Sequence, residues 1–175
     1  GFLDESGISE RPTVRRSWAP RGKTPMVVSP GHWRTHSVTG TIVCTPQGGN
    51  PRVYLRIVRG TVCSKEFIRF VKHLRRHVRG KLILLMDRLA VHRSRETTAF
   101  LKTQQSWLIV AWFPAYAPEL NPIEYLWSAS KRKDFANFCP DTITELDKRI
   151  RRSIRRIRRK QNILRGFLKA SSLFP

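Results

Sequence analysis

Hydrophobic and polar residues alternate along two stretches in the first third of the chain. Residues 52–58 alternate aliphatic side chains with arginines and a tyrosine, and residues 36–44 are rich in threonine and valine. A period of two is typical of a strand with one covered face. Gly48, Gly49 and Asn50 lie between the two stretches and favour a short connection. The pattern therefore predicts two neighbouring antiparallel strands.

The spacing of apolar residues becomes helical after these strands. In residues 64–78, Phe67, Ile68, Val71 and Leu74 recur on one face of a helix. We therefore expect an amphipathic helix here, with its basic residues in solvent.

Two later stretches are apolar without interruption. Residues 82–86 and 107–113 predict strands, and the first of these is expected to be covered on both faces in the middle of a sheet. Residues 94–105 between them have the composition of a helix. A strand, a helix and another strand form a right-handed parallel unit.

The first 30 residues are predicted to contain little regular secondary structure. Phe2 and Leu3 begin a short strand that Gly7 is expected to break, and residues 11–30 are rich in Pro and Arg, which favours an irregular excursion or a short hairpin. Antiparallel strands first and parallel strands later predict an α/β fold. We expect a ribonuclease H-like mixed sheet flanked by helices.

The end of the chain is predicted to be helical. A helix begins at Asn121, a break is expected near Cys139 and Pro140, and a last helix starts at Asp141 or Thr142. An apolar stripe with a seven-residue repeat runs along that last helix. Its members are Ile143, Ile150, Ile157 and Leu164.

The charge balance points to a polyanionic partner. The 175 residues include 34 Lys and Arg against 12 Asp and Glu, a net charge of +22. Residues 148–175 hold 11 basic residues and no acidic one, so this short segment carries half of the net charge. DNA or RNA is the expected partner, because its phosphates release counterions when cations neutralise them.

Several classes are excluded by the same composition. With 40% hydrophobic residues the chain can build a core, so it is not a disordered basic tail. No stretch approaches the length of a membrane span, and we expect a cytoplasmic protein with no membrane partner. The three cysteines are far apart and form no zinc motif.

The basic last helix has two interpretations. It could be a solvated helix docked by its apolar stripe, or its exposed cations could also contact DNA phosphates; we favour the second, because unpaired cations on one helix repel one another. The candidate DNA-binding residues on it are Arg151, Arg152, Arg155, Arg156, Arg158 and Arg159.

Three acidic residues stand at structured positions of this basic chain. Asp4 follows the first strand, Asp87 follows the apolar strand 82–86, and Glu124 lies in the first turn of the helix that begins at Asn121. Cleavage of a phosphodiester needs charge stabilisation on two oxygens, which a pair of Mg²⁺ ions about 4 Å apart supplies. Carboxylates are the ligands such ions prefer.

Each acid also has a purely structural interpretation. Asp4 could be a turn residue, and Asp87 could simply end its strand. Glu124 could complete a helix cap, because Asn121 and Pro122 are typical of a helix start. It is as a set on adjacent elements that the three fit a metal site. Glu5 and Glu119 are further acidic residues close to this site and are reserve candidates for ligands.

Four motifs resemble the catalytic domain of mariner-superfamily transposases of the bacterial insertion-sequence branch. They are FLDESG at residues 2–7, WAPRGKTP at 18–25, the apolar strand into Asp87 with His92 five residues later, and PAYAPELNPIEYLW at 114–127. The resemblance covers residues 1–137 in the family's order. Residues 1–137 are therefore expected to be the DDE catalytic domain, and residues 138–175 a basic helical extension.

The resemblance implies a reaction and its ligands. Asp4, Asp87 and Glu124 would hold two Mg²⁺ ions, with Mn²⁺ as a substitute and Asp4 between them. The reaction would be DNA cleavage at transposon ends, followed by attack of the freed 3′-hydroxyl on target DNA. The expected partners are double-stranded DNA and a second copy of the chain, as a homodimer on DNA.

The same motifs suggest further DNA contacts. Arg21 and Lys23 suit phosphate contacts, whereas Trp18 is expected to be packed. His92 is expected to contact substrate or water near the metals, or to have a packing role. Arg88 stands where the family usually has Asn, and so places a permanent cation beside the metal site.

Two alternative functions remain from the sequence. The chain lacks the family's amino-terminal helix-turn-helix region, so it could be a truncated, catalytically silent DNA-binding remnant. A nuclease acting on RNA in hybrids is the third possibility. Because all three bind nucleic acid, only cleavage separates them.

Overall fold

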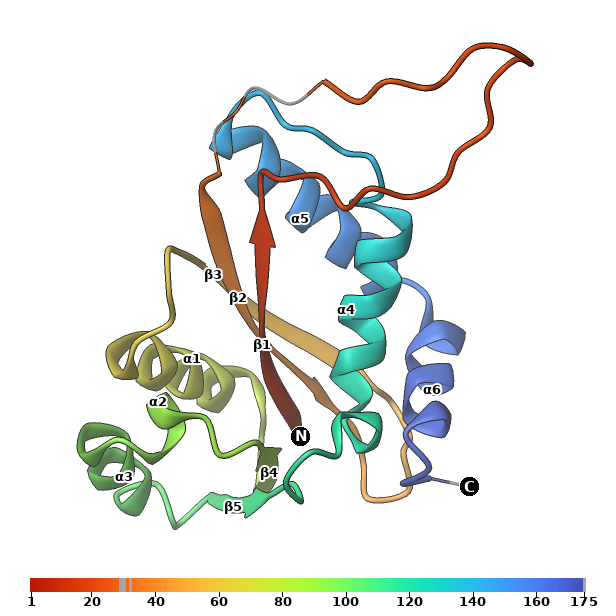
Figure 1. The fold of residues 1–175 in the computed structure, drawn as a ribbon. Coiled ribbons are helices and arrows are strands. Elements are labelled where there is room, and N and C mark those ends of the chain that lie inside the picture. Colours follow the sequence, from red (N-terminus) through yellow and green to blue (C-terminus); the bar gives the residue numbers. More distant parts are fainter. Residues whose placement is uncertain (29–30, 32, 175) are drawn as a thin grey trace.

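A five-stranded sheet with helices on both faces forms the body of the protein (Figure 1). The computed structural model describes residues 1–28, 31 and 33–174. The strands are β1 (Phe2–Ser9), β2 (Thr35–Val43), β3 (Arg52–Arg59), β4 (Leu82–Met86) and β5 (Leu108–Trp112). Their order in the sheet is β3-β2-β1-β4-β5.

The directions of the strands confirm the predicted fold class. β1 pairs with β2, and β2 with β3, in antiparallel fashion. β4 pairs with β1 and with β5 in parallel fashion. The sheet is therefore mixed, antiparallel among its first strands and parallel among its later ones.

The helices divide between the two faces of the sheet (Figure 1). They are α1 (Ser64–His77), α2 (Ala90–Arg93), α3 (Arg95–Lys102), α4 (Pro122–Lys133), α5 (Ile143–Arg158) and α6 (Gln161–Ala170), with a 3-10 turn, η1 (Pro118–Leu120), before α4. The first three helices lie on one side and the last three on the other. Among the described residues, no helix has the length and apolarity needed to cross a bilayer.

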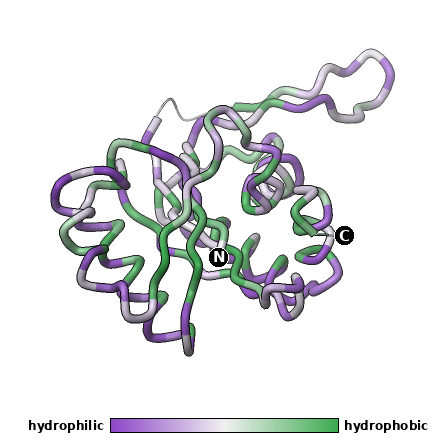
Figure 2. Tube along the Cα trace, turned by 90° about the horizontal axis from the view of Figure 1, so that it is seen from below, coloured by the Kyte–Doolittle hydropathy of each residue, from purple (hydrophilic) through white to green (hydrophobic). Residues whose placement is uncertain are grey.

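Each face of the sheet has its own hydrophobic cluster. Phe67, Phe70 and Leu74 of α1 are buried against the face that carries Leu3 and Leu84. In Figure 2 the hydrophobic parts of the trace lie mainly in the interior, between the strands and the helices. The sheet is thus a layer between two cores.

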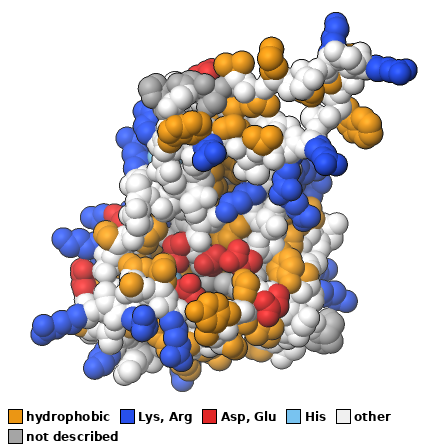
Figure 3. All heavy atoms as spheres, viewed as in Figure 1, with side chains coloured by type: hydrophobic (Ala, Val, Ile, Leu, Met, Phe, Trp, Pro, Cys, Tyr) orange, Lys and Arg blue, Asp and Glu red, His pale blue; other side chains and the backbone are white. Residues whose placement is uncertain are grey.

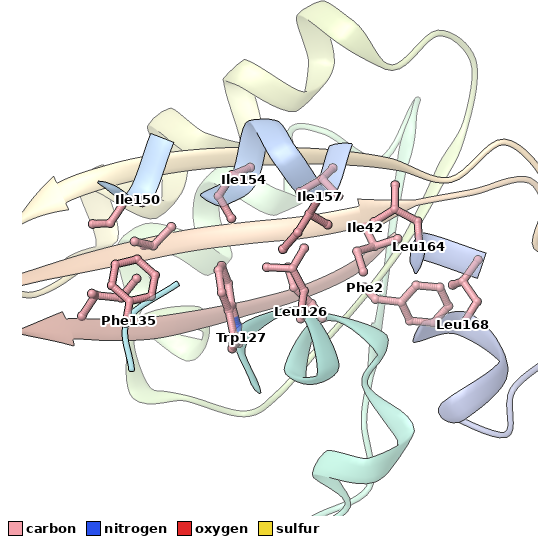
Figure 4. Packing of buried hydrophobic residues seen from close by; sticks show 14 of the residues in the cluster. Phe2, Ile42, Leu126, Trp127, Phe135, Ile150, Ile154, Ile157, Leu164 and Leu168 are labelled. Atoms are coloured by element: carbon pink, nitrogen blue, oxygen red, sulfur yellow. The ribbon is translucent and has the colours of Figure 1, made fainter. Parts of the chain in front are cut away.

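The second cluster joins the last three helices to the start of the chain. Leu126 and Trp127 of α4, Ile154 of α5 and Leu168 of α6 pack with Phe2 of β1 (Figure 4). The division between residues 1–137 and 138–175 stays a prediction, since both parts contribute to this one core.

β1 is longer than predicted, because Gly7 does not break it. The strand pairs with β2 over its whole length, from Phe2 opposite Ile42 to Ser9 opposite Thr35. The hydrogen bonds of this ladder outweigh the weak strand preference of glycine.

The prediction that residues 82–86 are covered on both faces is wrong. Leu82, Leu84 and Met86 are buried, but Ile83 is 54% exposed, and its neighbour Ile109 on β5 is 52% exposed. The helices α4 to α6 cover β1, β2 and β3, so this end of the sheet has one open face.

The single last helix predicted from the apolar repeat is in fact two helices. α5 ends at Arg158 and α6 starts at Gln161, so the chain turns at Arg159 and Lys160. Both helices keep their apolar side chains in the core, as Ile157 and Leu164 are fully buried.

A long arm leaves the body between β1 and β2 (Figure 1). Residues 11–28 contain no helix and no strand beyond one isolated bridge, from Thr13 to Ala136. This agrees with the predicted irregular excursion, apart from residues 29–30, which lie outside the described residues. Trp18 is 100% exposed, so the expectation that it is packed is wrong.

Candidate active site

The sheet register brings the first two acids together. Phe2 of β1 lies beside Leu85 of β4 in a parallel pair. Two residues further along both strands, Asp4 comes level with Asp87. Neighbouring strands are about 4.8 Å apart, so the two backbones place these carboxylates at one edge of the same cleft.

Asn121 attaches the third acid to the same strand. Its side-chain Nδ2 donates a buried hydrogen bond of 3.1 Å to the carbonyl oxygen of Leu3, and its Oδ1 caps α4 by accepting from the Ile123 amide at 3.4 Å. Pro122 occupies the first turn, where no amide hydrogen is needed. Glu124 is thereby held in the first turn of α4, next to Asp4.

The indole of Trp127 holds the Asp4 carboxylate. Its Nε1 donates to Asp4 Oδ2 at 2.9 Å, and the residue is only 3% exposed, so Trp127 points into the core. Gly40 of β2 makes room for this ring: a Cβ there would lie 2.8 Å from the Trp127 ring and 2.7 Å from Leu55. Any other residue at Gly40 would therefore press on the group that positions Asp4.

The carboxyl of Asp4 lies close to two other acidic side chains. Burial, together with the carboxylates of Glu124 and Glu5, raises its pKa from 3.8 to about 7, although the indole hydrogen bond acts in the opposite direction. Such a carboxyl favours either a proton or a cation beside it.

The neighbouring acid, Glu5, points to the other face of β1 and contacts a buried histidine. His92 of α2 is 1% exposed, and its ring packs on Phe67 with the centroids 4.7 Å apart. Its Nε2 lies 3.2 Å from Glu5 Oε1, and its Nδ1 lies 2.9 Å from Asp87 Oδ1. The imidazole thus bridges β1 and the end of β4.

Both ring nitrogens of His92 face acceptors, so the doubly protonated ring suits this position. Burial acts to lower the pKa of His92, but the hydrogen bonds to Asp87 and Glu5 outweigh it and raise the pKa to about 10. The same contact with His92 lowers the pKa of Asp87. Asp87 Oδ1 also accepts from the Leu89 amide at 3.0 Å. Among the described residues, no hydrogen bond falls on Oδ2, which leaves it for a ligand.

Acidic side chains gather in one patch of the face shown in Figure 3, with Lys and Arg at its margins. A groove of about 410 Å³ runs beside the patch along α4 and is lined by Glu119, Glu124, Trp127, Ser128 and Lys131 among others. We refer to it as the α4 groove. In the part of the chain that the structure describes, no three His, Cys, Asp or Glu side chains already surround a single cation position.

The candidate DNA-binding residues of the first half of the chain lie in three different settings. Arg21 and Lys23 are exposed on the arm, and Arg88 is exposed directly after Asp87. His92 is buried between Glu5 and Asp87, which leaves it no surface for contact with DNA. Its position suits a role in holding Asp87.

The candidate residues of α5 and of the turn that follows it also differ among themselves. Arg151, Arg155 and Arg158 line a groove of about 200 Å³ between α5 and β3. Arg152 and Arg159 are exposed. Arg156 instead forms an ion pair of 2.7 Å with Asp134, so its charge is already balanced within the protein.

Sequence reasoning placed the three acids but missed most of their supports. Gly40 carried no signal beyond its position in a Thr- and Val-rich strand. Glu5 was expected only as a reserve acid, and His92 only as a candidate for substrate contact or packing. The alternation of Asp4 and Glu5 along a strand was the one available hint that they serve opposite faces.

Comparison with known proteins gives one curated relative of bacterial origin. The chain is 30% identical over 159 residues to the insertion element IS630 uncharacterized 39 kDa protein of Shigella sonnei. The match covers 86% of this chain and 43% of the relative, so the chain spans less than half of that protein's length.

Solved structures of a mariner transposase have the same fold. The Mos1 transposase paired-end complex with left transposon end matches with a TM-score of 0.62 and 16% identity, over 98% of this chain and 55% of that one. The catalytic domain of Mos1 mariner transposase matches with a TM-score of 0.53 and 18% identity, over 95% of this chain and 81% of that one. Further paired-end complexes of Mos1 that match were solved with Mn and with Mg. The likeness establishes a ribonuclease H-like fold.

A family model matches residues 1–147, a span that includes Asp4, Asp87 and Glu124. Since this span is most of the chain, the protein belongs to the DDE superfamily endonucleases.

Proposed function

We propose that this chain is the catalytic domain of a DNA transposase that cleaves transposon ends and transfers the freed 3′-hydroxyl strand to target DNA with the help of divalent metal ions. The single observation that carries the proposal is that three carboxylates come from adjoining elements at one edge of the sheet. Asp4 comes from β1, Asp87 follows β4, and Glu124 starts α4, while Asn121 and the sheet register tie the three together.

The residues present fit a pair of Mg²⁺ or Mn²⁺ ions. Every candidate ligand is a carboxylate oxygen, which hard divalent cations prefer. The raised pKa of Asp4 reflects burial and negative charge that a cation would compensate. Asp4, Asp87 and Glu124 would hold the ions, and water would complete their coordination.

The ions, when bound, supply positive charge to the attacking and leaving oxygens of the phosphodiester. The protein's own residues orient the groups. Trp127 fixes one oxygen of Asp4, and His92 with the Leu89 amide fixes one oxygen of Asp87, so each acid offers its other oxygen to the cleft. Arg88 is exposed beside Asp87 and suits a contact with the phosphate of the substrate. No covalent intermediate on the protein is required.

DNA is the proposed partner, and both ends of the chain offer cations for it. Arg21 and Lys23 lie on the arm, and the groove between α5 and β3 carries Arg151, Arg155 and Arg158. We exclude Arg156 from this set because it pairs with Asp134.

A second copy of the chain is also part of the proposal. The arm exposes Trp18 (100%), Met26 (88%) and Val28 (82%), an apolar surface that suits contact with protein. A dimer on DNA, in a bacterial cytoplasm near the nucleoid, fits these features. Light scattering with and without DNA tests the dimer.

Cleavage of supercoiled plasmid with Mg²⁺ or Mn²⁺ tests the proposed function. The wild-type chain should nick the plasmid, and Asp4→Asn, Asp87→Asn and Glu124→Gln should each abolish nicking while the chain remains folded. Nicking that survives all three substitutions would refute the site. A folded wild-type chain that binds DNA but never nicks it would favour the silent remnant.

A further inference from the structure

The α4 groove has an acidic end and a basic end. Glu124, Ser128 and Lys131 are four and seven positions apart along α4, so they lie on one face of the helix. All three line the same groove, together with Trp127. Glu124 belongs to the candidate metal site, whereas Lys131 lies two helical turns away from it.

A second groove continues from Lys131 toward the arm. It has a volume of about 240 Å³ and is lined by Ser9, Arg11 and Thr13 at the end of β1, with Lys131 on its other wall. Among the described residues, the ion pairs include neither Lys131 nor Arg11. Figure 3 shows Lys and Arg side chains above the acidic patch, on the side of the arm. We call the two grooves together the α4–β1 track.

The cations of the track lie at a spacing that matches a DNA strand. Seven residues of α-helix rise about 10 Å, and the phosphates of one DNA strand recur about every 3.4 Å along the helix axis. With α4 parallel to the DNA axis, Lys131 would lie about three nucleotides away from a phosphate held at Glu124. Ser128, exposed between them, can donate its hydroxyl to an intervening phosphate oxygen.

We propose that the α4–β1 track binds the DNA strand that is cut, with Lys131 on a phosphate two or three nucleotides from the scissile one and Arg11 on a phosphate further along. The proposal rests on the proposed function, since the acidic end of the track is the candidate active site. It adds a direction: the strand leaves the metal site along α4 toward the base of the arm. Lys131 then offsets the repulsion that Glu119 and Glu124 exert on the backbone.

Variants on two faces of α4 distinguish a contact in the groove from a general effect of removing one positive charge. Lys131→Ala removes the cation in the groove, and Lys131→Arg keeps it. Lys133→Ala is the matched control: it removes the same charge from the same helix, but two residues turn a helix by about 200°, so Lys133 points away from the groove. All three variants should unfold at the same urea concentration as the wild type.

Binding is measured first, by fluorescence anisotropy in EDTA, on short DNA duplexes with one methylphosphonate moved along one strand. We expect Lys131→Ala to bind unmodified duplex about tenfold more weakly, as for a lost hydrogen bond to a charged group. Lys131→Arg should bind like wild type. One or two methylphosphonate positions should weaken wild-type binding and have no further effect on Lys131→Ala. Identical interference profiles for the two proteins, or an equal loss in Lys133→Ala, would overturn the proposal.

Nicking of the same duplexes then locates the contact. Where the wild type nicks, the sensitive methylphosphonates should lie two or three nucleotides from the nick, and Lys131→Ala should raise the KM for duplex more than it lowers kcat. Sensitive positions far from the nick would overturn the assignment of Lys131. A wild type that binds with the expected interference but does not nick would refute the proposed function and leave the track supported.

Discussion

The buried carboxyl of Asp4 predicts an unusual dependence of stability on pH. Its pKa is about 7 in the folded chain and 3.8 without the fold. Between these values the unfolded chain releases the proton, while the folded chain retains it. In the absence of metal the free energy of unfolding should therefore fall as pH rises from about 4 to 7.

The size of this effect follows from the shift. One pKa unit corresponds to about 1.4 kcal/mol, and Asp4 is already partly ionised in the folded chain at pH 7, so the free energy of unfolding should fall by about 2 kcal/mol between pH 5 and pH 7. Urea unfolding in EDTA at these two pH values measures it. Asp4→Asn is the control, because it keeps the shape of the side chain and cannot titrate. His92 has a raised pKa, so its contribution to stability declines only above about pH 6.5. Both proteins contain His92, so this contribution cancels when their free energies of unfolding are compared.

Metal should reverse the trend. Mg²⁺ replaces the proton on a carboxylate, so its stabilisation of the wild type should be larger at pH 7 than at pH 5 and absent in Asp4→Asn. The reasoning fails if wild type and Asp4→Asn differ by the same amount at both pH values.

Three further predictions concern the supports of the site and the basic helix. Gly40→Ala should cost about 1 to 3 kcal/mol of stability by overpacking Trp127, and should reduce nicking more than DNA binding; unchanged nicking would show that the indole can shift freely. His92→Asn should lower the free energy of unfolding by about 3 to 5 kcal/mol, because it leaves a buried acid unpaired. It should also weaken Mn²⁺ binding measured by isothermal titration, and an unchanged Mn²⁺ affinity would contradict the role of His92 in holding Asp87. Arg155→Ala should reduce the salt dependence of DNA binding by about one phosphate contact, whereas Arg156→Ala should lower the free energy of unfolding in urea and leave the salt dependence unchanged. The reverse pattern would exclude the groove between α5 and β3 as a DNA contact.

Local patterns in the sequence were sufficient for most of the sheet. The alternation in residues 52–58 and the continuous apolar run at 82–86 correspond to β3 and β4, and the parallel pairing of β4 with β5 was expected from the strand, helix and strand pattern. Asp87 and Glu124 were found because each stands at the end or the start of such an element, whereas Asp4 lies within β1 and not at its end.

Long-range contacts account for what the sequence did not reveal. β1 continues past Gly7 because β2 pairs with it there. The chain turns between α5 and α6 without Pro or Gly, and the side chain of Gln161 donates to the carbonyl oxygen of Pro51, 110 positions away. The contact of His92 with Glu5 joins residues 87 positions apart. No local pattern carries such information.

The attachment of Asp4 to Trp127 gives this protein a simple evolutionary route to inactivity. The indole that holds the carboxylate is part of the hydrophobic core, whereas the arginines of the groove between α5 and β3 lie on the surface. A substitution that repacks the core around Gly40 would disturb Asp4 and leave these arginines in place. On the proposed function, a chain damaged in this way would still bind DNA without cutting it, and would compete with active copies for the same sites.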